Sequence, residues 1–117
     1  MLSGALLLCG SRGLLVSPRD LVPVARALCP GGWLVLSGGA RGVDSAAPAL
    51  ASMLGWHHAP IRPEYGIFGR SAPLARDDEL VALCSCVLAV WDGRSRGTAY
   101  TLARAAALGR PIYVLRR

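Results

Sequence analysis

Residues 33–44 read Trp-Leu-Val-Leu-Ser-Gly-Gly-Ala-Arg-Gly-Val-Asp, and this stretch decides the fold. The apolar run 33–36 is typical of a strand that is buried on both faces of a sheet. A glycine-rich loop, 37–42, follows directly, and a run of small residues from Val43 to about Leu54 then predicts a helix that ends at Gly55. A buried strand that passes through such a loop into a helix is the repeating unit of a parallel α/β sheet.

The same unit recurs on both sides of this stretch. A helix that begins after Ser17, with Pro18 in its first turn, ends before Pro30, and Arg62–Pro73 is expected to be a loop. Asp77, Asp78 and Glu79 are expected in the first turn of the helix after that loop, where the helix dipole favours acidic side chains. The other expected helices are Ala75–Leu83 and Thr98–Leu108, and the strands are Ala5–Cys9, Trp33–Leu36, Trp56–Ile61, Cys86–Trp91 and Pro111–Leu115.

This order of elements predicts one Rossmann-like domain, residues 1–117, with a doubly wound parallel five-stranded sheet and helices on both faces. The segment Trp56–Ile61 is the most polar of the expected strands, which favours a place at the sheet edge. A length of 117 residues suits one domain, and an apolar content of 53% with 17% charged residues excludes a disordered chain. The tryptophans Trp33, Trp56 and Trp91 are expected in the core, with Trp91 near enough to the ligand edge to flank a base.

Targeting and metal signals are missing from the sequence. No apolar run approaches the roughly 18 residues that a membrane helix needs, and Met1–Cys9 lacks the basic start of a signal peptide. The four cysteines form no CxxC pair, and His57 and His58 have no matching ligand spacing, so we expect no metal site. We therefore expect a cytoplasmic protein with buried, reduced thiols.

The net charge is +6, and all 13 basic residues are arginines. Lysine, asparagine and glutamine are absent, as GC-rich coding produces, and the missing amides also fit a protein from a thermophile. A basic surface attracts nucleic acid, but coding bias alone also produces it.

The glycine-rich loops follow strands that all run in the same direction, so they meet at one edge of the sheet. Glycines and helix N-termini there suit a phosphate, and arginines suit any anionic ligand. Asp44 is expected to cap its helix or to bond a ribose hydroxyl or a loop amide, and Asp92 to act similarly. Thr98 is expected to cap the last long helix, and His57 and His58 to be structural. The candidate ligand residues are Gly10, Ser11, Arg12, Ser37, Gly38, Gly39, Ala40, Arg41, Gly42, Asp44, Arg76, Asp92, Gly93, Arg94, Ser95, Arg96, Gly97 and Thr98.

Four motifs together resemble the SLOG superfamily, which unites the Smf/DprA DNA-processing proteins and the LOG (lysine decarboxylase-like) proteins in a Rossmann-like fold. They are Gly10-Ser11-Arg12, residues 37–44, the segment 63–66 (Pro-Glu-Tyr-Gly) with 72–76 (Ala-Pro-Leu-Ala-Arg), and residues 91–98. The branch they resemble most is that of the small stand-alone YspA/YpsA-like proteins, and the match covers nearly the whole chain.

The resemblance implies a nucleotide-derived ligand such as AMP, ADP-ribose or NAD, and no certain cofactor. Phosphate positions would be Gly38, Gly39, Gly42, Gly97 and Thr98, and the pocket would be completed by Ser11, Arg12, Asp44 and Arg76. LOG phosphoribohydrolases carry a glutamate after their glycine loop, whereas here Ala99-Tyr100-Thr101 follows Thr98.

Three functions therefore stay open. The first is a nucleotide-binding protein, for example a sensor. The second is a nucleoside-monophosphate phosphoribohydrolase that uses Asp44, Asp92 or Glu64 as the anion and Arg76 or Arg94 as the phosphate anchor. The third is DprA-like binding of single-stranded DNA. We also expect a homodimer, although the alanine-rich helix face at Leu102–Leu108 suits packing on its own sheet equally well.

Overall fold

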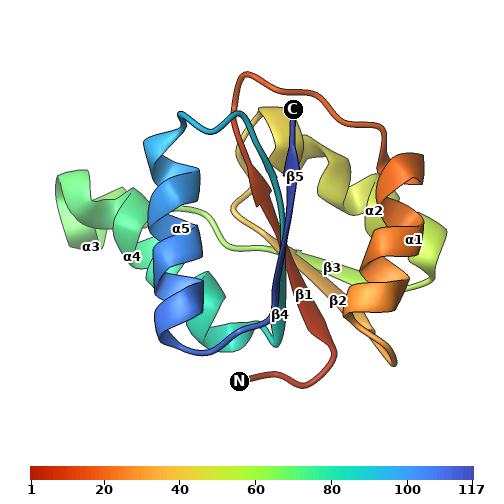
Figure 1. Cartoon of the computed structure of the whole chain (residues 1–117). Coiled ribbons are helices and arrows are strands. Elements are labelled where there is room, and N and C mark those ends of the chain that lie inside the picture. The colour runs from red at the N-terminus through yellow and green to blue at the C-terminus, as the bar shows by residue number, and fades with distance from the viewer.

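Short apolar runs form one parallel sheet in the computed structural model, which describes all residues from Met1 to Arg117 (Figure 1). The sheet has five strands in the order β3-β2-β1-β4-β5, and every neighbouring pair is parallel. The strands are β1 (Ala5–Gly10), β2 (Leu34–Ser37), β3 (His57–Pro60), β4 (Cys86–Trp91) and β5 (Ile112–Arg116). The expected fold class is confirmed.

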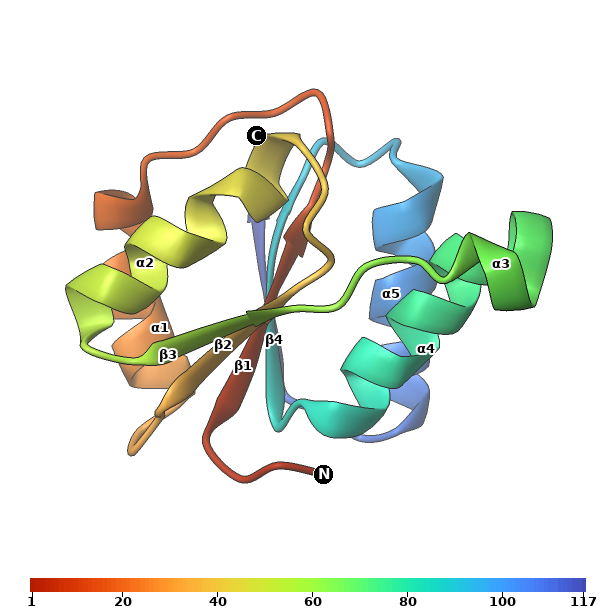
Figure 2. The same ribbon diagram turned by 180° about the vertical axis from the view of Figure 1, so that it is seen from behind.

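Helices cover both faces of the sheet. Helices α1 and α2 lie on one face and α4 and α5 on the other, and the short helix α3 projects beyond α4 (Figures 1 and 2). The α-helices are α1 (Pro18–Leu28), α2 (Ala47–Leu54), α3 (Tyr65–Phe68), α4 (Ala72–Leu83) and α5 (Arg96–Ala107), and the 3₁₀ helices are η1 (Gly42–Ala46) and η2 (Gly69–Ser71).

Two apolar clusters hold these layers together. Successive strand residues point to opposite faces, so Leu6 and Leu8 pack under α1 and α2, whereas Leu7 packs under α4 and α5. All three leucines are completely buried, and each contributes about 2 kcal/mol through the loss of apolar surface from water. The central strands β1 and β4 are therefore apolar at every position, unlike the alternating strands of a half-exposed sheet.

The direction in which successive strands are added to the sheet reverses beside β1. The chain runs from β1 to β2 and β3 on one side, and then crosses back to form β4 and β5 on the other side. The helices switch faces at the same point. The carboxyl ends of β1, β2 and β4 therefore border one crevice, which is where ligands bind in sheets of this kind.

Two predicted elements have different bounds in the structure. The expected helix from Val43 to Leu54 is split into η1 and α2. Pro48, in the first turn of α2, has no N–H to donate, so a regular α-helix cannot run through it from Val43.

The expected loop Arg62–Pro73 is wrong in part, because it contains α3, η2 and the start of α4. Pro73 occupies the first turn of α4, a position that its fixed φ favours. Asp77, Asp78 and Glu79 consequently lie in the middle of α4 and not in its first turn, as the sequence pattern had indicated.

Near the edges of the sheet, one prediction is confirmed and another is wrong. Strand β3 lies at the edge, as its polarity predicts. Trp33, in contrast, is 45% exposed and is not a core residue, since its indole Nε1 donates to the carbonyl oxygen of Ser3 at 2.7 Å. An indole has an apolar ring and an N–H group that needs a hydrogen-bond acceptor, so a position at the boundary between apolar and polar surroundings is favourable for it.

The alanine-rich face of α5 has a partner inside the chain. Ala105 is completely buried, and Leu102 packs against the same cluster as Leu7. This face of the helix thus packs on its own sheet, which is the second of the two alternatives left open above, and the expected dimer stays a prediction.

All four cysteines are free, three of them buried and Cys9 partly so. No helix is long and apolar enough to cross a membrane.

Candidate functional site

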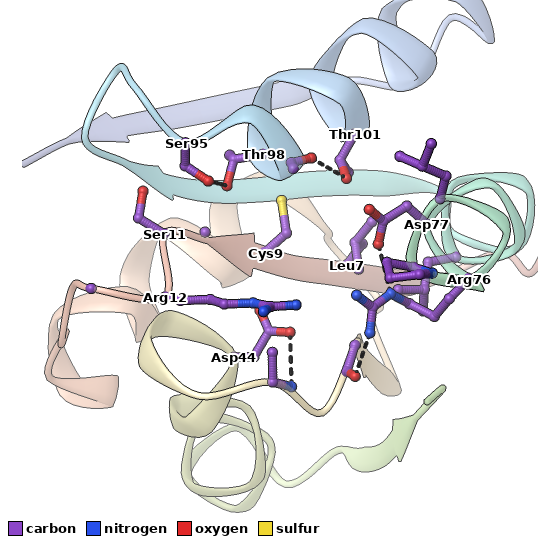
Figure 3. Close-up of a pocket in the computed structure, with 18 of the residues that line it drawn as sticks. Leu7, Cys9, Ser11, Arg12, Asp44, Arg76, Asp77, Ser95, Thr98 and Thr101 are labelled. Atoms are coloured by element: carbon purple, nitrogen blue, oxygen red, sulfur yellow. Dashed lines mark hydrogen bonds and ion pairs between the residues drawn. The ribbon is translucent and has the colours of Figure 1, made fainter. Parts of the chain in front are cut away.

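A pocket of about 450 Å³ lies at the carboxyl ends of β1, β2 and β4 (Figure 3). Its wall comes from the three loops that follow these strands, together with α4 and the first turns of α5. The residues that line it are Leu7, Cys9, Gly10, Ser11, Arg12, Gly13, Gly38, Ala40, Asp44, Pro73, Leu74, Arg76, Asp77, Leu80, Asp92, Ser95, Gly97, Thr98 and Thr101.

The structure divides the predicted site residues into two groups. Those that line the pocket are Gly10, Ser11, Arg12, Gly38, Ala40, Asp44, Arg76, Asp92, Ser95, Gly97 and Thr98. Those that do not line it are Ser37, Gly39, Arg41, Gly42, Gly93, Arg94 and Arg96. The three loops therefore meet at one edge of the sheet, as the topology predicted. The residues that form the pocket wall are only partly the predicted ones.

Arg76 is the buried cation of the pocket, with 8% of its surface exposed. Its Nη1 donates to the carbonyl oxygen of Gly38 at 2.7 Å, and its Nε donates to Asp77 Oδ1 at 2.7 Å. The bond to Gly38 joins α4 to the loop after β2, the bond to Asp77 stays within α4, and Nη2 makes no hydrogen bond within the protein. A Cβ at Gly38 would lie 2.6 Å from Arg76 Nη1, so glycine is required there for the guanidinium to approach the backbone.

Asp44 is the buried carboxyl group on the opposite side of that loop, with 9% of its surface exposed. It belongs to η1, and its Oδ2 accepts the Ala40 N–H at 3.3 Å, so it bonds a loop amide and caps no α-helix. Burial raises the pKa of Asp44, and the Ala40 amide and the charge of Arg76 only partly counteract this. Asp44 therefore takes up a proton at a higher pH than an ordinary aspartate.

Three polar residues of the pocket had not been predicted: Cys9, Asp77 and Thr101. Burial raises the pKa of Cys9, and the neighbouring Asp44 and Asp77 raise it further, so the thiol is neutral and is no nucleophile at pH 7. Burial also raises the pKa of Asp77 despite its ion pair with Arg76. Position in the sequence carried a signal for two of them, since Cys9 directly precedes the predicted Gly10 and Thr101 is three helical residues from the predicted Thr98.

Asp92 has a structural task in the loop after β4. Its Oδ1 accepts the N–H groups of Arg94 and Ser95, both at 2.8 Å, and its own N–H donates to Ser11 Oγ at 3.2 Å. The bonds from Ser95 and Arg94 lower the pKa of Asp92, which is thus ionised and occupied by its own loop. As a candidate catalytic anion, it is less available than Asp44.

The expected arginine cluster contributes only one residue to the pocket wall. All four of its arginines are exposed, and Arg12 lines the pocket whereas Arg41, Arg94 and Arg96 lie outside the wall. A guanidinium loses its hydration when it is buried, so a buried arginine in such a wall needs partners of the kind that Arg76 has, whereas Arg12 reaches the wall from an exposed position. We call Arg41, Arg94 and Arg96 the rim arginines, because each is next in sequence to a loop or lining residue of the pocket.

The remaining candidates have other surroundings. His58 Nε2 and Ser37 Oγ lie 2.9 Å apart and share a hydrogen bond between β3 and β2, and burial lowers the pKa of His58. Glu64 is exposed and does not line the pocket. Thr98 is a helical residue of α5, whose N-cap is Ser95, so it does not cap that helix; its Oγ1 lies 3.2 Å from Ser95 Oγ. No group of three His, Cys, Asp or Glu side chains is placed to hold a metal ion.

Fold and pocket together define a class of protein: a Rossmann-like α/β domain with a polar pocket at the carboxyl edge of its sheet. Within that class, the chain is similar to a solved structure of DNA processing protein A from Helicobacter pylori, which was described for its single-stranded DNA binding mode. The TM-score is 0.64 at 20% sequence identity, and the match covers 99% of this chain and 66% of that one. This likeness shows a common fold. No protein-family model and no curated protein matches the chain.

Proposed function

We propose that this chain binds a nucleotide or a nucleotide-derived ligand, of the AMP, ADP-ribose or NAD kind, in the pocket at the carboxyl edge of the sheet. One observation carries the proposal: segments far apart in the sequence place the buried polar side chains of Ser11, Asp44, Arg76 and Thr98 around one hollow. Proteins bury polar groups at a cost, and a convergent set of them in a pocket indicates a ligand.

The size and position of the pocket agree with this proposal. Small-molecule pockets usually measure about 300–1,000 Å³, and this one measures about 450 Å³. It lies at the change of strand order, where nucleotide ligands bind in doubly wound sheets. The N-terminus of α5 borders it through Gly97 and Thr98 and suits a phosphate.

Membership of the SLOG superfamily, near the YspA/YpsA-like branch, is part of the proposal. Residues of all four motifs that carry the resemblance line the pocket, among them Ser11, Gly38, Arg76 and Gly97. The Rossmann-like fold and the structural likeness to DNA processing protein A support the superfamily level.

A ligand screen tests the function. Thermal unfolding of the chain is measured with AMP, ADP-ribose and NAD, because a ligand at 100 times its dissociation constant adds about 2.7 kcal/mol of stability. We expect at least one of the three to raise the melting temperature. The same samples, separated by chromatography, show whether a nucleotide is hydrolysed. Unchanged melting temperatures with all three would overturn the proposal.

A matched pair of variants places the binding. A Cβ at Gly97 would meet no heavy atom within 4 Å, so Gly97→Ala has room in the unbound chain. Gly66 in α3 is equally open and lies outside the pocket wall, so Gly66→Ala is the control. We expect Gly97→Ala to weaken nucleotide binding and Gly66→Ala to leave it unchanged. Equal affinities would place the ligand elsewhere.

Single-stranded DNA is a second candidate ligand, and the rim arginines favour it. Arg41, Arg94 and Arg96 are exposed beside the pocket, the net charge is +6, and the protein of similar fold binds single-stranded DNA. Binding through phosphates would weaken steeply with salt. A titration of a fluorescent single-stranded oligonucleotide at several salt concentrations tests it, and affinity that does not depend on salt would contradict it.

A further inference from the structure

The two edges of the sheet differ in how they are protected against pairing with another chain. Strand β3, at one edge, has four residues, is polar at His57 and His58, and ends in Pro60, which has no N–H to donate. Strand β5, at the other edge, is apolar from Ile112 to Leu115. It runs between α5 and α1 with no element in front of it (Figure 1). The β5 edge is therefore the one that is open to a further strand.

The backbone of β5 turns every second residue away from the sheet. The carbonyl oxygen of Pro111 accepts the Val87 N–H at 2.9 Å. The N–H of Arg117 donates to the carbonyl oxygen of Trp91 at 3.0 Å. Residues along a strand alternate in direction, so the odd-numbered residues of this segment bond β4. The N–H and C=O groups that point outward belong to Ile112, Val114 and Arg116.

The side chains of β5 leave this edge uncovered. Tyr113 and Val114 are both exposed and lie on opposite faces of the strand. Arg116 is the one charged residue inside β5, and its guanidinium carbon lies 5.8 Å from the centre of the Trp91 ring, over β4. The middle of the edge therefore lacks the charged side chains that usually protect an exposed strand.

A groove of about 470 Å³ continues this edge along α1. Helix α1 carries Asp20 in its first turn and Arg26 in its last turn, and both side chains are exposed. In an antiparallel pair of α1 helices, the acidic first turn of each would lie near the basic last turn of the other. The groove thus suits a second copy of itself. It is lined by Pro23, Val24, Ala27, Leu28 and Tyr113.

We propose that β5 and this groove form a twofold interface with a second copy of the chain, in which the two β5 strands pair antiparallel and join the two sheets into one. With the axis at Val114, that residue lies opposite its own copy, and Arg116 lies opposite Ile112. Tyr113 of each copy then lies beside Leu115 of the other. No two arginines are directly opposite, an arrangement that would be destabilising.

This interface closes at the dimer and leaves the pocket free. The polar β3 edge, with Pro60, offers no second place for strand pairing. None of the residues that line the pocket belongs to β5 or α1. A short strand and a shallow groove bury an area at the low end of specific interfaces, about 1,200 Å², so we expect a dissociation constant of about 10 µM. The chain is then monomeric in dilute unfolding experiments at about 1 µM.

Sedimentation equilibrium of the full chain, from about 1 µM to about 200 µM, tests the interface. We expect a monomer–dimer equilibrium without larger species. Ala27→Arg places a bulky like charge in the groove and should weaken self-association by about tenfold or more. Ala103→Arg is the matched control, because Ala103 is an exposed alanine of α5, outside the interface. It should change the dissociation constant by less than about twofold.

Two variants at Val114 separate strand pairing from a contact between helices alone. The Val114 N–H points outward, so Val114→Pro breaks no bond to β4 and removes a donor only from the dimer. Val114→Lys keeps that donor and places two like charges opposite each other at the axis. Each variant should weaken self-association by about tenfold or more, with an unchanged melting temperature at about 1 µM.

The results decide the proposal without reference to the nucleotide site. A chain that stays monomeric up to about 200 µM, or that forms species larger than a dimer, overturns it. A dimer that Ala27→Arg and Ala103→Arg weaken equally uses another surface, which also overturns it. A dimer that keeps its affinity in both Val114 variants forms without pairing of β5 and overturns the strand interface.

Discussion

The molecule has two hollows of nearly equal volume, and their walls differ. The pocket at the carboxyl edge measures about 450 Å³, and a groove beside α1 measures about 470 Å³. Only 5 of the 19 residues that line the pocket are hydrophobic. The groove is lined by five residues, of which 4 are hydrophobic; the five are Pro23, Val24, Ala27, Leu28 and Tyr113. Volume alone therefore does not distinguish a candidate ligand site from another hollow, whereas buried polar groups that converge from several elements do distinguish it.

The rim adds a second contrast, between arginines. Arg76 is buried and bonded to two groups of the protein, whereas Arg41, Arg94 and Arg96 are exposed. The same residue type thus has different surroundings in helix α4 and around the mouth of the pocket. The predictions below test whether pocket, rim and groove differ in function as they differ in chemistry.

The largest effect is expected for Arg76→Ala. The variant loses the bond to Gly38 and leaves Asp77 partly buried without its partner, which should lower the free energy of unfolding by about 3 kcal/mol in urea denaturation. The control is Arg104→Ala, because the ion pair of Arg104 with Asp78 is about half exposed, and its loss should cost less than about 1 kcal/mol. Equal losses would mean that the pocket contributes no more stability than the surface.

Gly38→Ala should weaken ligand binding as well as folding. The new Cβ would lie 2.6 Å from Arg76 Nη1 and 2.9 Å from Asp44 Oδ2, so it displaces both side chains from the pocket wall. We expect AMP affinity, measured by calorimetry, to fall by about tenfold or more, with overpacking that costs about 1–3 kcal/mol. A variant that binds AMP like the parent chain would remove the pocket from the proposed function.

Replacing the three rim arginines by alanine should separate rim from pocket. The slope of the logarithm of DNA affinity against the logarithm of salt concentration should decrease by about 2, because about 0.7 counterions are released per phosphate of a single strand. AMP affinity at physiological salt should change by less than about twofold, since charges outside the pocket are screened there. A large loss of AMP affinity would show that the rim belongs to the nucleotide site.

The pH dependence of stability tests the electrostatics of Asp44. Burial raises its pKa in the folded chain, so the folded state binds the proton more tightly than the unfolded state does. The stability that this proton contributes is present below the unfolded pKa and is lost as the pH rises through the folded pKa. Asp44→Asn should therefore gain stability relative to the parent at pH 7, and the gain should shrink as the pH falls. A difference independent of pH would contradict the raised pKa.

The smallest effect is expected in the groove. Tyr113 is 45% exposed, and Tyr113→Ser should change the free energy of unfolding by less than about 0.5 kcal/mol. AMP affinity should stay the same within error in a parallel titration. If this substitution weakens AMP binding, the contrast between the two hollows fails.

Most of the fold could be predicted because the signals are local. The apolar runs that became β1 and β4, the glycines that follow them, and Pro18 at the start of α1 each act on neighbouring residues. The errors arose where local signals were weak or mixed. Pro73 starts α4 earlier than the pattern of Asp77 and Asp78 indicated, and Trp33 found its bond to Ser3 at the surface.

The candidate site was predictable in position and not in composition. Parallel strands bring the ends of β1, β2 and β4 to one edge whatever their side chains are, so Ser11, Gly38 and Thr98 were found. Which long side chains turn inward depends on partners from other elements. Arg76 is held by a carbonyl group of the loop after β2, and no comparable partner holds Arg94 or Arg96.

The sequence by itself determined the class of the fold, the order of its elements and the edge at which its glycine-rich loops meet. These properties follow from hydrophobic pattern, glycine and proline positions, and the single direction of the strands. Only the tertiary structure decided that Cys9, Asp77 and Thr101 share the pocket with Asp44 and Arg76. Their placement depends on the packing of α4 and α5 against β1, and the physical reason is desolvation: a charged group is buried only where another part of the chain supplies its hydrogen bonds.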